Sequence, residues 1–147
     1  MVLTLRSSSA PEGCARMSWA AFDAAADAMA AMVRELAPAA RAIRGIPRGG
    51  LPLAVALSHR TGLPLAGPED VDGIVVVDDV VQTGQTFKEC AAADLFLCWI
   101  SKNPDVPVLS VIRLPATAWV VFPWEDFEAA SDDAERYYKS REKRGGT

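Results

Sequence analysis

The chain has 147 residues, of which 50% are apolar and 23% are charged, and its formal net charge is −4. This length and apolar content suffice for one globular domain with a full core and exclude an intrinsically disordered chain. The negative charge disfavours nonspecific binding to nucleic acid or anionic membranes, and no apolar stretch reaches the roughly 18 residues of a membrane-spanning helix.

Cysteine and histidine usage limits the metal and redox chemistry open to the chain. Cys14, Cys90 and Cys98 are an odd set without a CxxC pair, which argues against a disulfide framework or a zinc site. His59 lies near the end of a predicted helix, so we expect it at the surface rather than in a catalytic triad. Residues 1–17 lack the continuous apolar core of a signal peptide. We therefore expect reduced thiols and a cytoplasmic protein.

The N-terminal half predicts an arm followed by a first helix. Residues 1–16 show no periodicity and are expected to form the arm. From Trp19 to Leu36 apolar residues recur near helical spacing, with Ser18 placed to cap this helix and Pro38 placed to stop it. A short strand is expected over Ala42–Ile46.

The Gly-rich turn after that strand leads into a second helix. This helix is expected over residues 51–60, and Gly62 is placed to end it in the left-handed conformation. Residues 63–66 predict a short strand and residues 67–72 an acidic turn.

The remaining elements complete an alternating pattern. A β-branched run predicts a buried parallel strand over residues 74–78. The elements expected after it are a helix over 86–100, a buried strand over 106–114, an irregular aromatic segment over 115–123 and a final helix over about 125–143. Alternation of strands and helices predicts an α/β fold, a mainly parallel twisted sheet flanked by helices. We expect one domain over residues 17–147.

The segment Ile74–Thr86 carries the strongest functional signal. The apolar run ends in Asp78 and Asp79, and after Val80, Val81 and Gln82 comes a loop of Thr83, Gly84, Gln85 and Thr86. The carboxyl end of such a strand is where open α/β sheets bind ligands. Adjacent carboxylates can accept hydrogen bonds from two sugar hydroxyls, and the loop can offer N–H groups and hydroxyls to a phosphate. The pattern therefore predicts a ribose phosphate site.

This segment resembles the phosphoribosyl diphosphate signature of type I phosphoribosyltransferases. Two more segments match that family in the same order. Ile43–Pro52 resembles its pyrophosphate loop, and Trp119–Glu125 is similar to the base-covering segment of xanthine-guanine phosphoribosyltransferases. Ser18 and Trp19 resemble the entry to that subfamily, so the resemblance covers roughly residues 17–126.

The resemblance implies a fold, a reaction and partners. The fold would be the Rossmann-like type I phosphoribosyltransferase fold with a minimal hood. The reaction would be purine salvage: transfer of 5-phosphoribosyl from phosphoribosyl diphosphate to a purine-like base, with Mg²⁺ and release of pyrophosphate. We expect no nucleic-acid or membrane partner, and a homodimer or homotetramer.

The resemblance also implies a role for each matching residue. Asp78 and Asp79 would hold the ribose hydroxyls, and Asp79 would also meet Mg²⁺. Arg48, Gly49 and Gly50 would hold the diphosphate, while the 5′-phosphate cradle would consist of Gln82, Thr83, Gly84, Gln85 and Thr86, with Val80 and Val81 beside it. The expected catalytic residues are Asp78, Asp79, Gln82 and Arg48.

Three further residues would receive the base. Trp119 would stack on the purine face, the backbone of Val120 would face the base edge, and Arg113 would read the 6-oxo group. The alternative for Trp119 is an ordinary core aromatic. The acid pair has its own alternative, a solvated strand end without a ligand. For the loop the alternative is a capped helix start, and for Arg48 it is a solvated side chain in a Gly-rich turn.

Three departures from the family bear on activity. Gln82 stands where purine subfamilies usually place an acid; its amide can hydrogen-bond N7 of the base but cannot accept a proton as a base. Only residues 66–71 fill the place of a long closing loop, and the hood between Arg113 and Trp119 is short. A short loop predicts slower transfer, more hydrolysis, or help from another subunit or the N-terminal arm.

Two other functions stay open. A non-catalytic regulatory module would bind a nucleotide or phosphoribosyl diphosphate without turnover, which Gln82 and the short loop favour. A purely structural or interaction protein would retain the fold alone.

Overall fold

The computed structural model describes residues 4–5, 14–130, 132–133, 135–136 and 139. The chain divides into two compact units, Asp23–Ala116 and the combination of Met1–Phe22 with Thr117–Thr147. The expected division into an arm over 1–16 and a domain over 17–147 stays a prediction. Among the described residues, no helix combines the length and apolar character that spanning a membrane requires.

The larger unit contains a four-stranded parallel sheet. Its strands are β3 (Ala42–Gly45), β4 (Ile74–Val81), β5 (Leu95–Ser101) and β6 (Leu109–Arg113), in the order β3-β4-β5-β6. Every neighbouring pair is parallel, so all carboxyl ends lie at one edge. The predicted α/β class with a mainly parallel sheet is confirmed.

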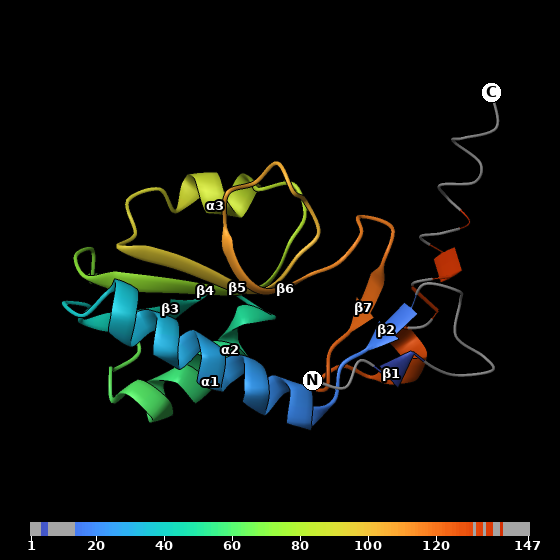
Figure 1. The fold of residues 1–147 in the computed structure, drawn as a ribbon, viewed down its shortest axis with the longest axis horizontal. Helices are drawn as coiled ribbons and strands as arrows, with labels where there is room; N and C mark the ends of the chain where they lie inside the picture. Colours follow the sequence, from blue (N-terminus) through green and yellow to red (C-terminus); the bar gives the residue numbers. More distant parts are fainter. Residues whose placement is uncertain (1–3, 6–13, 131, 134, 137–138, 140–147) are drawn as a thin grey trace. The chain divides into compact units, whose positions relative to one another are not determined.

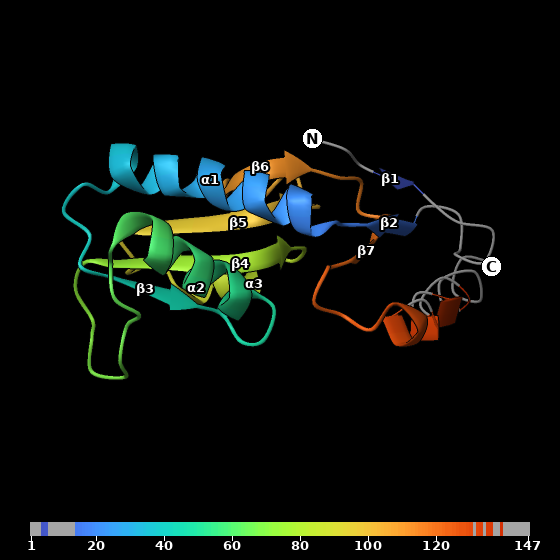
Figure 2. The same ribbon diagram turned by 90° about the horizontal axis from the view of Figure 1, so that it is seen from below.

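Helices cover both faces of this sheet (Figures 1 and 2). Helix α1 (Trp19–Leu36) and helix α2 (Gly50–Thr61) lie on one face, and the short α3 (Gln85–Glu89) lies on the other. The predicted start of α1 and the predicted end of α2 are confirmed. Ser18 Oγ accepts a hydrogen bond from Ala21 N–H at 3.0 Å, and Gly62 ends α2 with a left-handed φ of 77°.

The core lies on the two faces of the sheet. Towards α3, Val76 and Cys98 pack with Val108 and the partly buried Phe87. Towards α1 and α2, alternation along the strands places residues that are wholly buried: Ile43, Val75, Val77, Leu97 and Trp99. Strands buried on both faces explain why β4 and β5 are almost continuously apolar.

The helix expected over residues 86–100 is wrong. Helix α3 ends at Glu89, and Leu95–Ser101 is β5, which pairs with both β4 and β6. The alanines before it favour a helix locally. Burial between two strands outweighs that preference, and a short apolar run carries no periodicity that separates the two outcomes.

Several boundaries also differ from expectation. Strand β4 continues beyond Asp78 to Val81, and β6 begins at Leu109 rather than at residue 106. Residues 63–66 contribute a single bridge, between Leu65 and Ile43. The final helix begins at Phe127 rather than at residue 125, and residues 140–143 lie outside the described residues.

The other unit contains a small sheet, so the expectation that residues 115–123 are irregular throughout is wrong. Strand β2 (Cys14–Arg16) pairs in parallel with β7 (Trp119–Val121), and β1 (Thr4–Leu5) pairs antiparallel with β2. Cys14 and Val121 are buried with Ala130. These strands come from opposite ends of the chain, so no local pattern could reveal their pairing.

Aromatic side chains pack within the same unit. Phe122 stacks on Trp124 with 4.9 Å between ring centroids, and Phe22 meets Trp124 edge to face at 5.9 Å. Trp19 joins this group beside Phe22 and is 54% exposed. The position of Trp19 at the start of α1 thus reflects packing within this unit.

Candidate functional site

The acid pair lies inside β4 rather than at its end. The strand continues past it, with Val80 and Val81 paired to Ile100 and Ser101. Asp79 N–H donates to Asp78 Oδ1 and Val80 N–H donates to Asp79 Oδ1, both at 2.8 Å. Each carboxyl group therefore has one oxygen turned back onto the chain.

Asp78 is buried, with 8% of its surface exposed. Burial, and to a smaller extent hydrogen bonding and charge repulsion from the neighbouring Asp79 carboxyl, together raise its pKa to about 7, with the Asp79 N–H partly offsetting them. The two carboxyl groups thus lie close enough to act on one ligand. Asp78 is not at a solvated strand end, because β4 extends beyond it to Val81.

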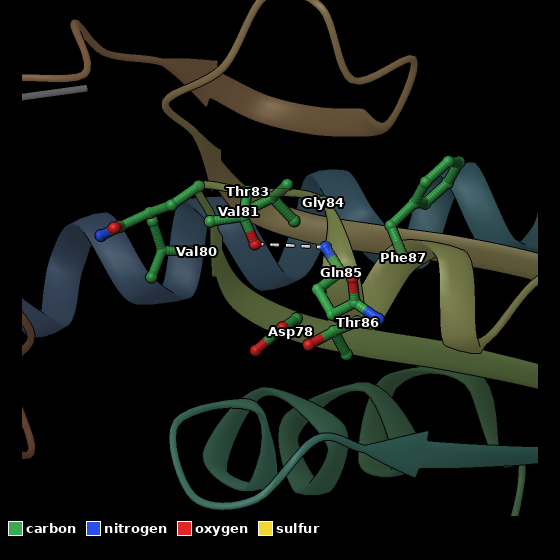
Figure 3. A pocket seen from close by; sticks show the side chains of 9 residues that line it. Asp78, Val80, Val81, Thr83, Gly84, Gln85, Thr86 and Phe87 are labelled. Atoms are coloured by element: carbon green, nitrogen blue, oxygen red, sulfur yellow. Dashed lines mark hydrogen bonds between the residues drawn. The ribbon is translucent and has the colours of Figure 1, made fainter.

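A pocket of about 260 Å³ opens beside Asp78 (Figure 3). Figure 3 shows Asp78, Thr83 and Thr86 around this pocket, with a hydrogen bond from Gln85 N–H to Thr83 Oγ1 at 3.3 Å. Its lining is Asp78, Val80, Val81, Gln82, Thr83, Gly84, Gln85, Thr86 and Phe87. All of the residues predicted for the phosphate cradle therefore line one pocket together with one of the acids.

Gly84 shapes the loop that forms this pocket. Its φ of 81° is left-handed, a conformation that favours glycine, and an added Cβ would lie 2.7 Å from Val106 Cγ2. Helix α3 has only five residues, so its dipole contributes little to anion binding. An anion in the pocket would instead be bound by individual backbone N–H groups at the start of α3.

The turn that carries Arg48 packs directly on the acid pair. A Cβ on Gly50 would overlap Val77 O, and a Cβ on Gly49 would overlap the Asp79 carboxyl group. Ile46 N–H also donates to Val77 O at 2.9 Å. Arg48 itself is exposed. Two segments that are far apart in the sequence thus meet at the carboxyl-terminal half of β4.

Arg113 lies at the carboxyl end of β6, paired with Ser101. Its guanidinium donates to Val108 O at 3.2 Å and to Ser101 Oγ at 3.4 Å, so it is engaged with the residue that precedes its own strand and with the last residue of β5.

Lys102 is a residue that the sequence reasoning missed. It follows β5 directly, is 3% exposed, and its N–H donates to Val81 O at 2.9 Å. A lysine that directly follows an apolar run could have marked Lys102 as a candidate in the sequence, because the carboxyl ends of parallel strands lie at one edge of the sheet.

Trp119 and Val120 lie in β7, in the other compact unit, and their roles stay predictions. His59 is exposed in the last turn of α2, as expected.

The acid pair could bind a magnesium ion together with a phosphate-bearing substrate, without a metal cage made of protein side chains alone. In the part of the chain that the structure describes, no group of three or more His, Cys, Asp or Glu side chains could hold a metal ion. Mg²⁺ commonly uses one or two carboxylates together with substrate phosphates and water, so it needs no such group. Asp79, with one oxygen turned away from its own strand, suits that role.

Known structures share this fold. No protein-family model matches the chain. It is similar to a purine phosphoribosyltransferase from Pyrococcus horikoshii Ot3, with 30% identity, coverage of 78% of this chain and 96% of that one, and a TM-score of 0.66.

Two more distant structures show the same fold. One is the xanthine-guanine-hypoxanthine phosphoribosyltransferase of Helicobacter pylori, with 16% identity, coverage of 82% and 97%, and a TM-score of 0.65. The other is a Neisseria gonorrhoeae protein solved with bound ppGpp, with 17% identity, coverage of 82% and 94%, and a TM-score of 0.61.

Proposed function

Because this chain belongs to the type I phosphoribosyltransferase family, we propose that it transfers the 5-phosphoribosyl group of phosphoribosyl diphosphate to a purine-like base and releases pyrophosphate. The observation that carries the proposal is the meeting of three features at the carboxyl-terminal half of β4. These are the acid pair, the 82–86 loop and the turn that carries Arg48.

The ribose would be held by the acid pair. The carboxyl groups of Asp78 and Asp79 would accept hydrogen bonds from the two adjacent ribose hydroxyls. Such charge-assisted hydrogen bonds are worth roughly 1.5–3 kcal/mol each. The 5′-phosphate would enter the pocket formed by residues 82–86, where Thr83 and Thr86 carry hydroxyls.

The departing diphosphate would be met by the turn at Arg48. The guanidinium of Arg48 can bind two phosphate oxygens at once, and the side chain is exposed and therefore accessible to a substrate. Magnesium, held by Asp79 and the substrate's own phosphates, would neutralise charge on the departing pyrophosphate. The chain's contribution is mainly to position the sugar and to stabilise charge as the bond to pyrophosphate weakens.

The base would be recognised by side chains at the same edge of the sheet. Gln82 lines the pocket and can donate its amide N–H to N7 of a purine. Lys102, which directly follows β5, is a second candidate, together with Arg113, for donation to a 6-oxo group. By the family resemblance, Trp119 and Val120 are the remaining candidates for contact with the base.

The direct test is incubation with phosphoribosyl diphosphate, Mg²⁺ and a panel of purine bases, with nucleotides detected by mass. We expect a nucleoside 5′-monophosphate to form with at least one 6-oxopurine. The double variant Asp78→Asn/Asp79→Asn is the control and should form none. No nucleotide with any base at high enzyme concentration would exclude the transferase.

A regulatory module that binds without turnover is the second candidate. The observation that favours it is Gln82, an amide in the pocket wall that cannot take up a proton. Calorimetry separates the two functions, since tight binding of a nucleotide together with an inactive enzyme would favour regulation. A nucleotide product in the base panel would reject it.

A further inference from the structure

Gly49 is a glycine for reasons of space, not of backbone conformation. Its φ of −64° and ψ of −29° lie in the right-handed helical region, which any L-residue adopts readily. A Cβ at this position would nevertheless overlap Oδ2 and Cγ of Asp79. The missing side chain therefore makes room for one particular carboxyl group.

The second oxygen of that carboxyl group is also held. Asp79 Oδ1 accepts the Val80 N–H at 2.8 Å, and Val80 is paired with Ile100 in the middle of the sheet. With Oδ1 bound to its own strand and Oδ2 against Gly49, the carboxyl group lies between β4 and the turn that carries Arg48.

The neighbouring glycines serve a different purpose. A Cβ on Gly50 would overlap Val77 O, and a Cβ on Gly45 would lie 2.8 Å from Gly50 O. Backbone atoms cannot yield without moving a strand or a turn, so these two glycines are needed for packing. At Gly49 the obstacle is the end of a side chain that can rotate. A substitution there should displace Asp79 rather than unfold the protein.

We propose that Gly49 is a positioning residue that sets where the Asp79 carboxyl group lies. The turn that would hold pyrophosphate and the acid that would hold ribose and metal are then aligned by direct contact, and this functional meaning rests on the proposed function. Gly49 needs no contact with the substrate to act in this way.

The first test uses no ligand. The ¹³C signal of the Asp79 carboxyl carbon is assigned by its disappearance in Asp79→Asn. It should shift in Gly49→Ala and stay in place in Gly67→Ala, where the added Cβ would lie no closer than 3.5 Å to Asp70 Oδ2. An unchanged Asp79 signal in Gly49→Ala overturns the proposal.

The second test measures ribose 5-phosphate binding with Mg²⁺ by calorimetry. Gly49→Ala should weaken binding about tenfold, or about 1.4 kcal/mol. In the Asp79→Asn background the same substitution should add no further loss, because the displaced group is already gone. An equal loss in both backgrounds would overturn the positioning role.

Two controls separate the possible failures. If wild type binds no ribose 5-phosphate while the Asp79 signal still shifts in Gly49→Ala, the proposed function falls and the positioning role stands. If Gly49→Ala does not fold, the double variant Gly49→Ala/Asp79→Ala removes the overlap. Restored folding in that variant supports the contact, and continued unfolding overturns it.

Discussion

Asp78 is an acid whose ionisation is opposed by its surroundings. Its pKa is raised to about 7 by burial and by the adjacent Asp79. Below about pH 4 the folded and unfolded chains both hold its proton, so it costs no stability. As the pH rises towards 7 the unfolded chain releases the proton while the folded chain keeps it, and stability falls; above that range the cost is constant.

Asp78→Asn should remove this pH dependence. Each pKa unit is worth about 1.4 kcal/mol, so the variant should equal or exceed wild-type stability by up to a few kcal/mol at pH 8, with no such gain at pH 4. Urea unfolding at both pH values measures this, with the exposed Asp94→Asn as control. If the stabilities of wild type and Asp78→Asn change in parallel with pH, the pKa of Asp78 is not raised in the folded protein.

Asp78→Asn should also weaken ligand binding. Loss of a charge-assisted hydrogen bond worth roughly 1.5–3 kcal/mol predicts a decrease in ribose 5-phosphate affinity of tenfold or more. Calorimetry at pH 8 measures it, where the wild-type acid is mostly ionised. Retained affinity with lowered stability would assign Asp78 to the core alone.

The loop between β4 and α3 depends on Gly84. Both Gly84 and Gly62 have left-handed backbones, with φ of 81° and 77°, but an added Cβ would meet Val106 only at Gly84 and nothing within 4 Å at Gly62. Gly62→Ala should therefore cost the conformational penalty of about 1–2 kcal/mol alone. Gly84→Ala should cost more and also weaken phosphate binding.

Urea unfolding and calorimetry with ribose 5-phosphate compare these two variants. Equal stability losses together with unchanged ligand affinity in Gly84→Ala would show that the loop's shape does not form the phosphate site.

The segment before β4 is tied to the sheet. Arg44 donates to Gly67 O and Asp70 O, both at 2.9 Å, and Gly67 N–H donates to Asp70 Oδ2 at 2.6 Å. These bonds hold the turn beside β3, a position unlike that of a loop free to close over substrate. Water should then capture part of the activated sugar.

We expect ribose 5-phosphate to accumulate beside the nucleotide at saturating base. Chromatography of the products, with Asp78→Asn/Asp79→Asn as the control for contaminating hydrolases, measures the ratio. A strict one-to-one yield of nucleotide and pyrophosphate would show that water is kept out by other means.

On the scale of the whole molecule, the residues predicted for the sugar and phosphates and those predicted to cover the base belong to different compact units. The acids, the loop and the Arg48 turn lie in Asp23–Ala116, whereas Trp119 and Val120 lie in the other unit. Trp119→Ala should raise the KM for the base roughly 5- to 150-fold, as loss of stacking worth about 1–3 kcal/mol implies, and leave ribose 5-phosphate affinity unchanged. Trp119→Phe should retain most of the base affinity. A parallel loss of both affinities would point to a packing role.

The expected dimer or tetramer and the cytoplasmic location stay predictions. Sedimentation equilibrium decides the first, and fractionation of cells that express the chain decides the second.

The sequence alone determined the elements whose signals are local. The bounds of α1, the Ser18 cap, the Gly62 end of α2 and the β-branched core of β4 all depend on residues within a few positions of each other. The family was also readable from the sequence, because its signature is a continuous segment, Ile74–Thr86.

Only the tertiary structure decided what depends on distant partners. Leu95–Ser101 became a strand because β4 and β6 flank it, and β2 joined β7 from the opposite end of the chain. The burial of Asp78 and the contact of the Asp79 carboxyl group with Gly49 likewise arise where separate segments meet. Hydrogen-bonded pairing and burial are properties of neighbours in space, and these neighbours are far apart along the chain.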